Sequence, residues 1–422
     1  MKVDAIQTCA SYIICAVITA GKKGLGVLSL GYTLDLWDDP AEAFGDPRQG
    51  LTGYSDSISY FALIAHSLRR KNLKPIQLAD NSWAYATNAY TPVDTLFRMF
   101  FLALRLAKRN AIDLIQVREC FFSGIAGYFL SRWLKLPMHV CVYGTDPFEP
   151  YWLRASWINR VISIWAKPIL RRAEGVQVDG SRTARNLSEA GIARDRIVVK
   201  PLIPDNLCDY LGDRRDSELL ANLSGNGRFR RFALFVGRVD SQKNLPLLLD
   251  VASKLKAGYP DLRYIIVGDG PKRPALERAI REQGLTDIVV CTGFKSHRDV
   301  VKYMASCDFF VLASVYEGFA RVLMEAAMSA MPIVTTDVSG SDDAVIHGKT
   351  GYIVPIGDAA AFSEALIELM EHPDRAVEMG RQSRRHMQQL VARYGDPKMQ
   401  VRIWDRIVGR AGINNSKVSR SD

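Results

Sequence analysis

The sequence has few residues of the kinds that build metal centres and disulfide frameworks. Six histidines occur among 422 residues, and none form the HxH or HExxH patterns that indicate a metal site. The cysteines form no CxxC pair and are odd in number, at Cys9, Cys15, Cys120, Cys141, Cys208, Cys291 and Cys307. This pattern argues against a disulfide framework and favours a reducing compartment. We therefore expect no metal centre and no disulfide-stabilised secreted fold.

The N-terminus lacks an apolar run of the roughly 20 residues that a membrane-spanning helix needs. The run AIQTCASYIICAVITAG covers residues 5–21 only. Asp4 and the single Lys2 make a poor start for a secretion signal, and no clear cleavage site follows. We treat residues 1–22 as an apolar extension, with two alternatives open: an interfacial anchor, or a segment upstream of the fold.

Acidic residues are too few to balance the basic ones, so the net charge is +10. A basic excess favours partners that are anionic, such as nucleic acid, a membrane surface or phosphorylated small molecules. The basic residues are dispersed, and no nucleic-acid motif accompanies them. We expect a nucleotide or an anionic membrane as partner, and no nucleic acid.

Short β-branched runs alternate with longer amphipathic stretches, which is typical of parallel sheets with crossover helices. In the first half we expect helices over 56–71, 93–109, 123–135 and 182–190, and strands over 25–30, 74–79, 113–117, 138–143, 175–178 and 196–200. In the second half we expect helices over 243–257, 272–283, 297–305, 320–330 and 358–371, and strands over 232–237, 263–268, 288–293, 308–313, 332–336 and 351–354. The pattern predicts an α/β protein with two Rossmann-like domains facing a cleft.

The domain limits follow from this order. After the extension of residues 1–22, we expect a first domain over 23–208 and a polar, glycine-bearing linker over 209–230. A second domain follows over 231–392. A helix over 393–410 is expected to return to the first domain, and a polar, disordered tail covers 411–422.

The segment VGRVDSQKN, residues 236–244, follows a predicted strand. Gly237 ends the strand, and Arg238 and Lys243 flank a tight loop before a helix. Two cations beside a helix N-terminus are suited to a diphosphate, because side-chain charges and free N–H groups both bind phosphate oxygens. The alternative is a solvated loop with two ordinary surface cations.

The segment YEGFARVLMEAAM, residues 316–328, holds two glutamates eight positions apart. Glu317 lies in a loop after a buried strand, and Glu325 lies on an apolar helix, where a carboxylate needs a partner. Sugar or ribose hydroxyls are suitable partners, and the N–H groups of Phe319, Ala320 and Arg321 would meet phosphate oxygens. The alternative is that Glu317 caps the helix while Glu325 is solvated on one face.

Taken together, these segments resemble the retaining glycosyltransferases of family 4, also called group 1, which have the GT-B fold. Glu317 and Glu325 match the E-x7-E motif of that family, and GRVDSQKN matches its G-R-x-x-x-x-K-N stretch. YIIVGDGP, VVCTGF and GSDDAVIHGKTGYIV fall at the spacings of further family motifs. The resemblance covers nearly all of residues 230–390 and is looser over 25–205.

The resemblance implies a role for each matching residue. Arg238 and Lys243 would hold the diphosphate, Glu317 would bind donor-sugar hydroxyls, and Glu325 would hold the ribose. Phe294 would lie beside the base, and Gly237, Gly318, Phe319, Ala320 and Arg321 complete the donor site. The co-substrate would be a UDP-sugar or GDP-mannose. Because cations occupy the place of a metal at the phosphates, no metal ion would be required.

The resemblance to the family is weaker in the first half, which would hold the acceptor. Glu119 stands where family members often have Asp or His, and the segment Tyr143 to Asp146 replaces a usual active-site histidine. Glu119 or Asp146 would supply hydrogen bonding or act as base toward the acceptor hydroxyl. The alternatives are a solvated carboxylate for Glu119 and a turn residue before Pro147 for Asp146.

The segment YWLRASWINRVISIWAKPILRRAEG, residues 151–175, is rich in tryptophan and arginine. This mixture suits an anionic membrane interface, although ordinary helices with buried tryptophans are the alternative. The resemblance implies a hexosyltransferase that builds cell-surface polysaccharide on a saccharide or lipid-linked acceptor, and with this basic, aromatic segment it places the protein on the cytoplasmic membrane face. The alternatives are a non-catalytic scaffold subunit and, less favoured, a sugar-nucleotide epimerase of the same fold.

Overall fold

The computed structural model describes residues 24–31, 37, 55–67, 72–144, 146–212 and 215–412. The chain divides into two compact units. The first comprises the chain up to Asp179, Thr183–Pro201 and the chain from Tyr394, and the second comprises Gly180–Arg182 and Leu202–Arg393. The expected extension of residues 1–22, and the expected tail beyond Gly412, lie outside the described residues.

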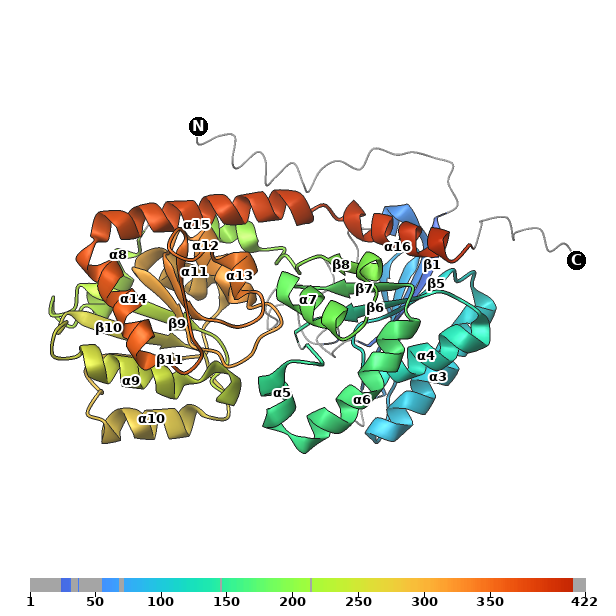
Figure 1. Ribbon diagram of the computed structural model, residues 1–422, viewed down its shortest axis with the longest axis horizontal. Helices are drawn as coiled ribbons and strands as arrows, with labels where there is room; N and C mark the ends of the chain where they lie inside the picture. The colour runs from blue at the N-terminus through green and yellow to red at the C-terminus, as the bar shows by residue number, and fades with distance from the viewer. Residues whose placement is uncertain are drawn as a thin grey trace, which may run out of the picture. The chain divides into compact units, whose positions relative to one another are not determined.

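The first unit is built on an eight-stranded sheet with the order β3-β4-β2-β1-β5-β6-β7-β8 (Figure 1). All paired strands run parallel except β3, which pairs antiparallel with β4. The strands are β1 (Leu25–Leu30), β2 (Ile58–Ala65), β3 (Ile76–Ala79), β4 (Ser82–Ala86), β5 (Leu114–Val117), β6 (Met138–Val142), β7 (Gly175–Val178) and β8 (Ile197–Val199). The order reverses between the neighbours β1 and β5.

Helices cover both faces of this sheet. They are α3 (Pro92–Arg109), α4 (Phe122–Leu134), α5 (Pro150–Ala155), α6 (Trp157–Arg172), α7 (Ser181–Glu189) and α16 (Lys398–Arg410). Alternate side chains of β1 enter two different cores, with Leu28 and Leu30 beneath α3, α4 and α6, and Val27 against α16. A strand covered on both faces is mostly apolar, and all six residues of β1 are buried, with Ser29 the one polar side chain among them.

The prediction of a helix over residues 56–71 is wrong. Residues Ile58–Ala65 form β2, which lies between β1 and β4 in the sheet. Five consecutive residues, Phe61 to Ala65, are fully buried, so the segment shows no amphipathic face. A short apolar run buried on both sides cannot be distinguished from a buried helix by periodicity. The strand β4 was also not predicted.

The helix α16 completes the first unit although it comes from the end of the described chain. Trp404 is fully buried, stacks on Phe61 with ring centroids 6.4 Å apart, and donates a hydrogen bond from Nε1 to His139 Nδ1 at 3.2 Å. Burial lowers the pKa of His139 to about 3. The imidazole is therefore neutral, with Nδ1 as the acceptor.

The second unit is built on a six-stranded, all-parallel sheet with the order β11-β10-β9-β12-β13-β14. The strands are β9 (Arg231–Val236), β10 (Leu262–Val267), β11 (Val289–Gly293), β12 (Phe309–Leu312), β13 (Ile333–Thr336) and β14 (Gly351–Val354). The helices are α8 (Ser217–Leu223), α9 (Leu245–Leu255), α10 (Arg273–Glu282), α11 (His297–Ser306), α12 (Arg321–Met328), α13 (Ser341–Ala344), α14 (Ala359–Glu371) and α15 (Pro373–Tyr394). This is the Rossmann strand order.

The structure also bears on the predicted linker, the cysteines and the question of membrane-spanning helices. The range 209–230, expected to be a linker, contains α8 and belongs to the second unit. Cys120, Cys141, Cys291 and Cys307 are free thiols, whereas Cys208 is disulfide-bonded. Among the described residues, no helix is long and apolar enough to span a bilayer.

Candidate functional site

The candidate donor site lies at the carboxyl ends of β9 and β12. These two strands are neighbours in the sheet, and the strand order reverses between them. In open α/β sheets, ligands bind outside the strand ends at such a reversal. Gly237 and Arg238 follow β9, and the loop of Ser314 to Glu317 follows β12. The two motifs found in the sequence therefore meet at one edge of the sheet.

An ion pair joins the two motifs. The ammonium group of Lys243 donates a hydrogen bond to the Glu317 carboxylate, and Ser314 Oγ donates to the same oxygen at 2.7 Å. Side-chain exposure is 15% for Lys243 and 8% for Glu317. Glu317 is thus neither a helix cap nor a solvated carboxylate. It is a buried acceptor held in one orientation by a cation and a hydroxyl.

Gln242 fastens the loop after β9 to the loop after β12. Its side-chain amide nitrogen donates to the Tyr316 carbonyl at 2.9 Å and to Glu317 Oε2 at 3.1 Å, and its backbone carbonyl oxygen accepts from the N–H of Val315 at 2.9 Å. Sequence reasoning missed both Gln242 and Ser314. Gln242 lies within the matched GRVDSQKN segment, so its position beside Lys243 was the available signal.

Two backbone segments, at Gly237 and Gly268, lie in close contact beneath this site. A side chain at Gly268 would place its Cβ 1.9 Å from the carbonyl oxygen of Gly237, and the backbone there has φ +140°. Glycine is therefore required where the VGDGP turn packs under the loop after β9. Arg238 extends outward, with 70% of its side chain exposed and its Nε 3.8 Å from Asp240. Of the two predicted cations, Lys243 is engaged with Glu317 and Arg238 faces solvent.

The helix α12 begins directly after Glu317. Ala320 precedes its first residue and supplies no side-chain cap. Within the described part of the chain, the backbone N–H groups of Gly318, Phe319, Ala320 and Arg321 donate no hydrogen bond. Uncapped N–H groups at a helix start attract anions. The predicted phosphate-binding residues thus surround one helix N-terminus.

Glu325 lies on α12 in a half-buried position beside Tyr210, which belongs to the 3-10 turn η4 (Leu207–Leu211). Burial raises the pKa of Glu325, although Arg321 and the hydrogen bond from Tyr210 act in the opposite direction. The Tyr210 hydroxyl also lies 3.3 Å from His297 Nδ1. Sequence reasoning missed Tyr210 because its segment lies more than one hundred positions before Glu325. Phe294, after β11, has 60% of its surface exposed.

In the first unit, Glu119 follows β5 at the reversal beside β1. Its carboxylate accepts from the N–H of Phe121 at 2.5 Å and from the N–H and hydroxyl of Ser123 at the start of α4. His66 Nε2 lies 3.7 Å from Glu119 Oε1. Burial raises the pKa of Glu119, but the hydrogen bonds from His66, Ser123 and Phe121 outweigh burial and lower it. His66 is a further residue that the sequence analysis missed.

Asp146 is 2% exposed and sits in a turn. Its two oxygens accept from the N–H of Phe148 at 2.9 Å and from Asn186 Nδ2 at 2.6 Å. Burial raises its pKa to about 6, against the lowering effect of these hydrogen bonds. The turn interpretation and the predicted role as a base are both compatible with this position, since the carboxyl titrates near neutral pH.

The raised pKa of Asp146 predicts how the free energy of unfolding changes with pH. Because folding raises the pKa of Asp146, the protonated carboxyl group stabilises the folded state below about pH 4. This contribution to the free energy of unfolding, roughly 3 kcal/mol, is lost as the pH rises through about 6. We expect Asp146→Asn to remove this dependence, as measured by urea unfolding between pH 4 and pH 7. Comparing the variant with the wild type cancels other titrating groups, and Asp94→Asn is the exposed control. Parallel pH profiles would contradict the assignment.

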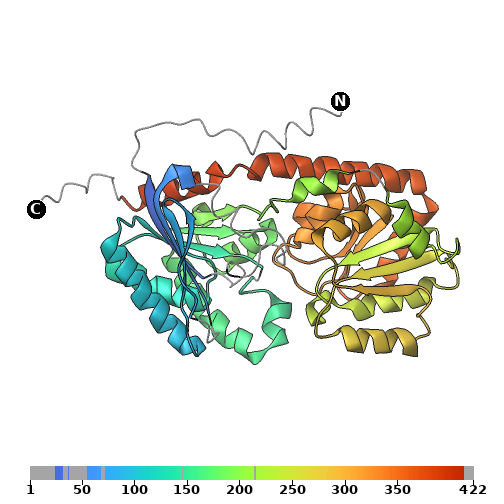
Figure 2. The same ribbon diagram turned by 180° about the vertical axis from the view of Figure 1, so that it is seen from behind.

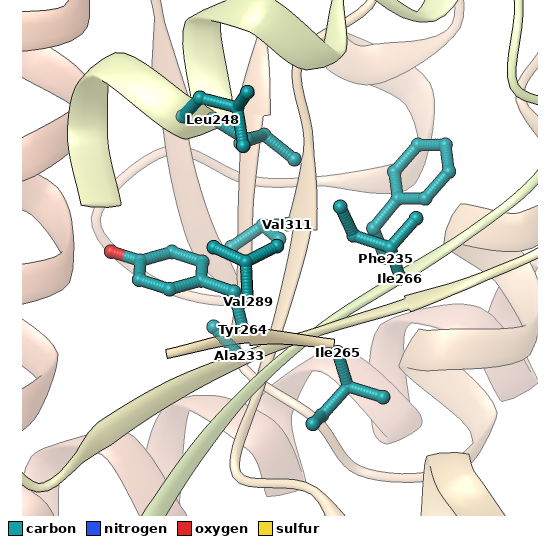
Figure 3. A pocket seen from close by; sticks show the side chains of 9 residues that line it. Ala233, Phe235, Leu248, Tyr264, Ile265, Ile266, Val289 and Val311 are labelled. Carbon is teal, nitrogen blue, oxygen red and sulfur yellow. The ribbon is translucent and has the colours of Figure 1, made fainter. Parts of the chain in front are cut away.

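The second unit has an interior pocket in its core (Figure 3). It is lined by core residues of the sheet and α9: Ala233, Phe235, Leu248, Leu249, Tyr264, Ile265, Ile266, Val289 and Val311. It leaves no room for a water molecule. We regard it as a packing defect of the core and not as a ligand site. Among the described residues, no cluster of His, Cys, Asp and Glu could hold a metal ion.

Comparisons with known proteins identify the family. Residues 225–386 match the model for glycosyl transferases group 1, and residues 76–202 match the glycosyl transferase 4-like domain. A 2-deoxystreptamine N-acetyl-D-glucosaminyltransferase from Niallia circulans is 32% identical over 66% of this chain and 72% of its own length. The chain belongs to the group 1 (family 4) glycosyltransferases. The alternatives of a scaffold subunit and an epimerase are not favoured.

Two further proteins are similar to this glycosyltransferase, one in fold and one in sequence. The Anabaena protein HepE, solved in complex with UDP, has a TM-score of 0.67 and 19% identity over 92% of this chain and all of its own. The GT-B fold prediction is thereby confirmed. An N-acetylgalactosaminyltransferase from Campylobacter jejuni is 34% identical over 33% of this chain and 38% of its own length. Its name specifies a diphospho-undecaprenol-linked acceptor.

Proposed function

We propose that this glycosyltransferase is a retaining hexosyltransferase that uses a nucleotide-sugar donor, either a UDP-sugar or GDP-mannose. The acceptor is a saccharide or a lipid-linked saccharide in the synthesis of a cell-surface polysaccharide. The observation that carries the proposal is the Lys243–Glu317 ion pair at the strand-order reversal beside the start of α12. The UDP complex of HepE and the lipid-linked acceptor of the Campylobacter relative support the substrate classes.

The charges of the site suit departure of a diphosphate. Lys243 has three N–H donors, so a phosphate oxygen can bind its ammonium group while Glu317 stays bound. Arg238 and the N–H groups at the start of α12 supply further positive charge. Groups that are preorganised around a developing negative charge lower the barrier for its formation. These cations take the place of a metal ion, so none is required in this proposal.

Glu317 and Glu325 bind the sugar and the ribose of the donor, respectively. Glu317 accepts hydrogen bonds from sugar hydroxyls, and its fixed orientation selects their arrangement. Glu325 accepts from the ribose hydroxyls, while Phe294 contacts the base. In the transfer, the bond from the anomeric carbon to the diphosphate oxygen breaks. A bond to the acceptor oxygen forms on the same face, and the acceptor hydroxyl loses its proton to the diphosphate or to a carboxylate.

Two carboxylates are available for the acceptor. Glu119 is ionised and already accepts three hydrogen bonds at the start of α4. Asp146 has a pKa of about 6, closer to the value that suits a general base at neutral pH. We therefore assign Glu119 to fixing the loop that meets the acceptor, and Asp146 to accepting the proton. The enzyme would act at the cytoplasmic face of the membrane, where lipid-linked acceptors are presented.

Calorimetric titration with UDP, GDP, UDP-glucose and GDP-mannose tests the donor assignment. We expect one nucleotide series to bind, and Glu325→Ala to weaken that binding about tenfold or more, since a hydrogen bond to a charged group contributes ~1.5–3 kcal/mol. Glu282→Ala, an exposed glutamate at the end of α10, is the matched control and should bind as the wild type does. Absence of binding to every nucleotide would overturn the proposed function.

A further inference from the structure

Three helices of the first unit expose large apolar side chains. Trp133 on α4 is 71% exposed, Phe101 on α3 is 61% exposed, and Trp165 on α6 is 55% exposed. The full set is Val93, Phe97, Phe101, Phe122, Phe129, Trp133, Trp157, Ile158, Val161, Ile164 and Trp165. Single exposed apolar residues need no explanation, but a group of this size marks an interaction surface. Of these helices, only residues 151–175 show a membrane-like composition in the sequence alone.

The exposed residues form one stripe on each helix. On α3 they recur at spacings of four, at Val93, Phe97 and Phe101, and on α4 at Phe122, Phe129 and Trp133. Residues at these spacings share one helix face. The opposite faces are buried against the sheet, through Met99 and Ala103 on α3 and through Gly127 and Ser131 on α4. The stripes therefore point away from the sheet.

The three helices lie side by side. The helix α4 packs against both α3 and α6, and Figures 1 and 2 show the three along one face of the first sheet. Helices that are packed in one layer present their outer faces on the same side. The stripes thus combine into one surface, which we call the aromatic face and define by the exposed residues named above.

The charges around the aromatic face are almost all positive. Asp94 is the one acidic residue in α3, α4, α5 and α6. The same helices expose basic side chains at Arg98, Arg105, Lys108, Arg109, Arg132, Arg154, Arg160 and Arg171. Aromatic rings at the level of lipid headgroups, surrounded by arginine and lysine, are typical of helices that lie in the plane of a membrane.

We propose that the aromatic face of α3, α4 and α6 docks this protein on an anionic lipid bilayer. The rings insert among the headgroups while the basic side chains bind lipid phosphates. A second copy of the chain is a poor occupant, because a symmetric contact would bring the same basic residues against one another. The proposal extends the membrane location given above but does not depend on the donor chemistry.

Vesicle flotation with the full chain tests the docking surface. We expect binding to phosphatidylcholine vesicles that contain phosphatidylglycerol, weak binding to phosphatidylcholine alone, and release at high salt because salt screens surface charge. The variant Phe97→Ser/Trp133→Ser/Trp165→Ser should lower the partition coefficient about tenfold or more. The variant Arg105→Glu/Arg109→Glu should lower it by at least about tenfold on anionic vesicles only.

Exposed residues of α15 in the second unit supply matched controls. Val377→Ser removes an exposed apolar side chain and Arg381→Glu/Arg385→Glu reverses two exposed charges outside the aromatic face, and both should leave vesicle binding unchanged. Circular dichroism and calorimetric nucleotide binding, unaltered in every variant, separate this test from that of the donor site. The proposal is overturned if the wild type does not float with anionic vesicles or if the face variants float equally well. It is also overturned if sedimentation shows a lipid-free dimer that the face variants lose.

Discussion

Lys243→Gln is expected to lower donor turnover about 10³-fold, because it removes the preorganised cation that we propose to stabilise the leaving diphosphate. The same change leaves the buried carboxylate of Glu317 without its counter-charge. Removing one partner of a buried ion pair costs ~3–5 kcal/mol of stability. Loss of activity alone would therefore not separate catalysis from folding. Release of the nucleoside diphosphate and urea unfolding should be measured on the same preparations.

A double variant separates the effect on catalysis from the effect on stability. Lys243→Gln/Glu317→Gln replaces both charges by neutral amides that can still hydrogen-bond, so we expect stability to recover while turnover stays about 10³-fold low. The exposed pair Arg228–Asp287, 3.3 Å apart, is the control, and its removal should cost under ~1 kcal/mol. Recovery of activity in the double variant would show that the pair serves the fold and not the reaction.

Trp404→Ala is expected to destabilise the first unit by about 4 kcal/mol, since it deletes the largest fully buried side chain of the described residues. Trp404→Phe should cost less, mainly through the lost hydrogen bond to His139. Urea unfolding followed by a probe in the first unit would measure both. Trp157→Ala, at a tryptophan that is 73% exposed, is the control and should change stability by under ~0.5 kcal/mol in the absence of lipid.

His139 adds a pH test to the same contact. Its folded-state pKa of about 3 lies below the ordinary value of 6.5, so its contribution to stability is fully present above about pH 6.5. That contribution is lost as the pH falls toward 3, at ~1.4 kcal/mol per pH unit. His139→Gln should flatten this acid sensitivity. A wild type and variant with the same slope between pH 6.5 and pH 4 would contradict a buried neutral imidazole.

The second half of the fold was more predictable than the first for a physical reason. Gly237 and Gly268 follow β9 and β10, Gly293 ends β11, and a helix follows each of these turns, so local sequence separates the elements. In the first half, β2 is buried on both faces and carries no periodicity. Its assignment depends on its place between β1 and β4 in the sheet, which local sequence does not reveal.

The site shows the same division between local and distant information. Glu317, Lys243 and Arg238 were found because each lies in a short motif whose chemistry is recognisable. Tyr210 and His66 were missed because they reach Glu325 and Glu119 from elements distant in sequence, and no local pattern marks them. The motifs predicted which residues would gather. They did not predict that Lys243 would bond to Glu317, since that contact depends on the register between two loops.

The position of α16 has a consequence for synthesis of the chain. The core on one face of the first sheet is completed by Ile403, Trp404, Ile407 and Val408, which the ribosome makes almost last among the described residues. Domains generally fold as they emerge. The second unit ends at Arg393 and can therefore fold before the first. Until α16 has been synthesised, β1 and β2 of the first unit leave one apolar face exposed. A chaperone that shields that face during translation would act on the N-terminal half of the chain, not the C-terminal half.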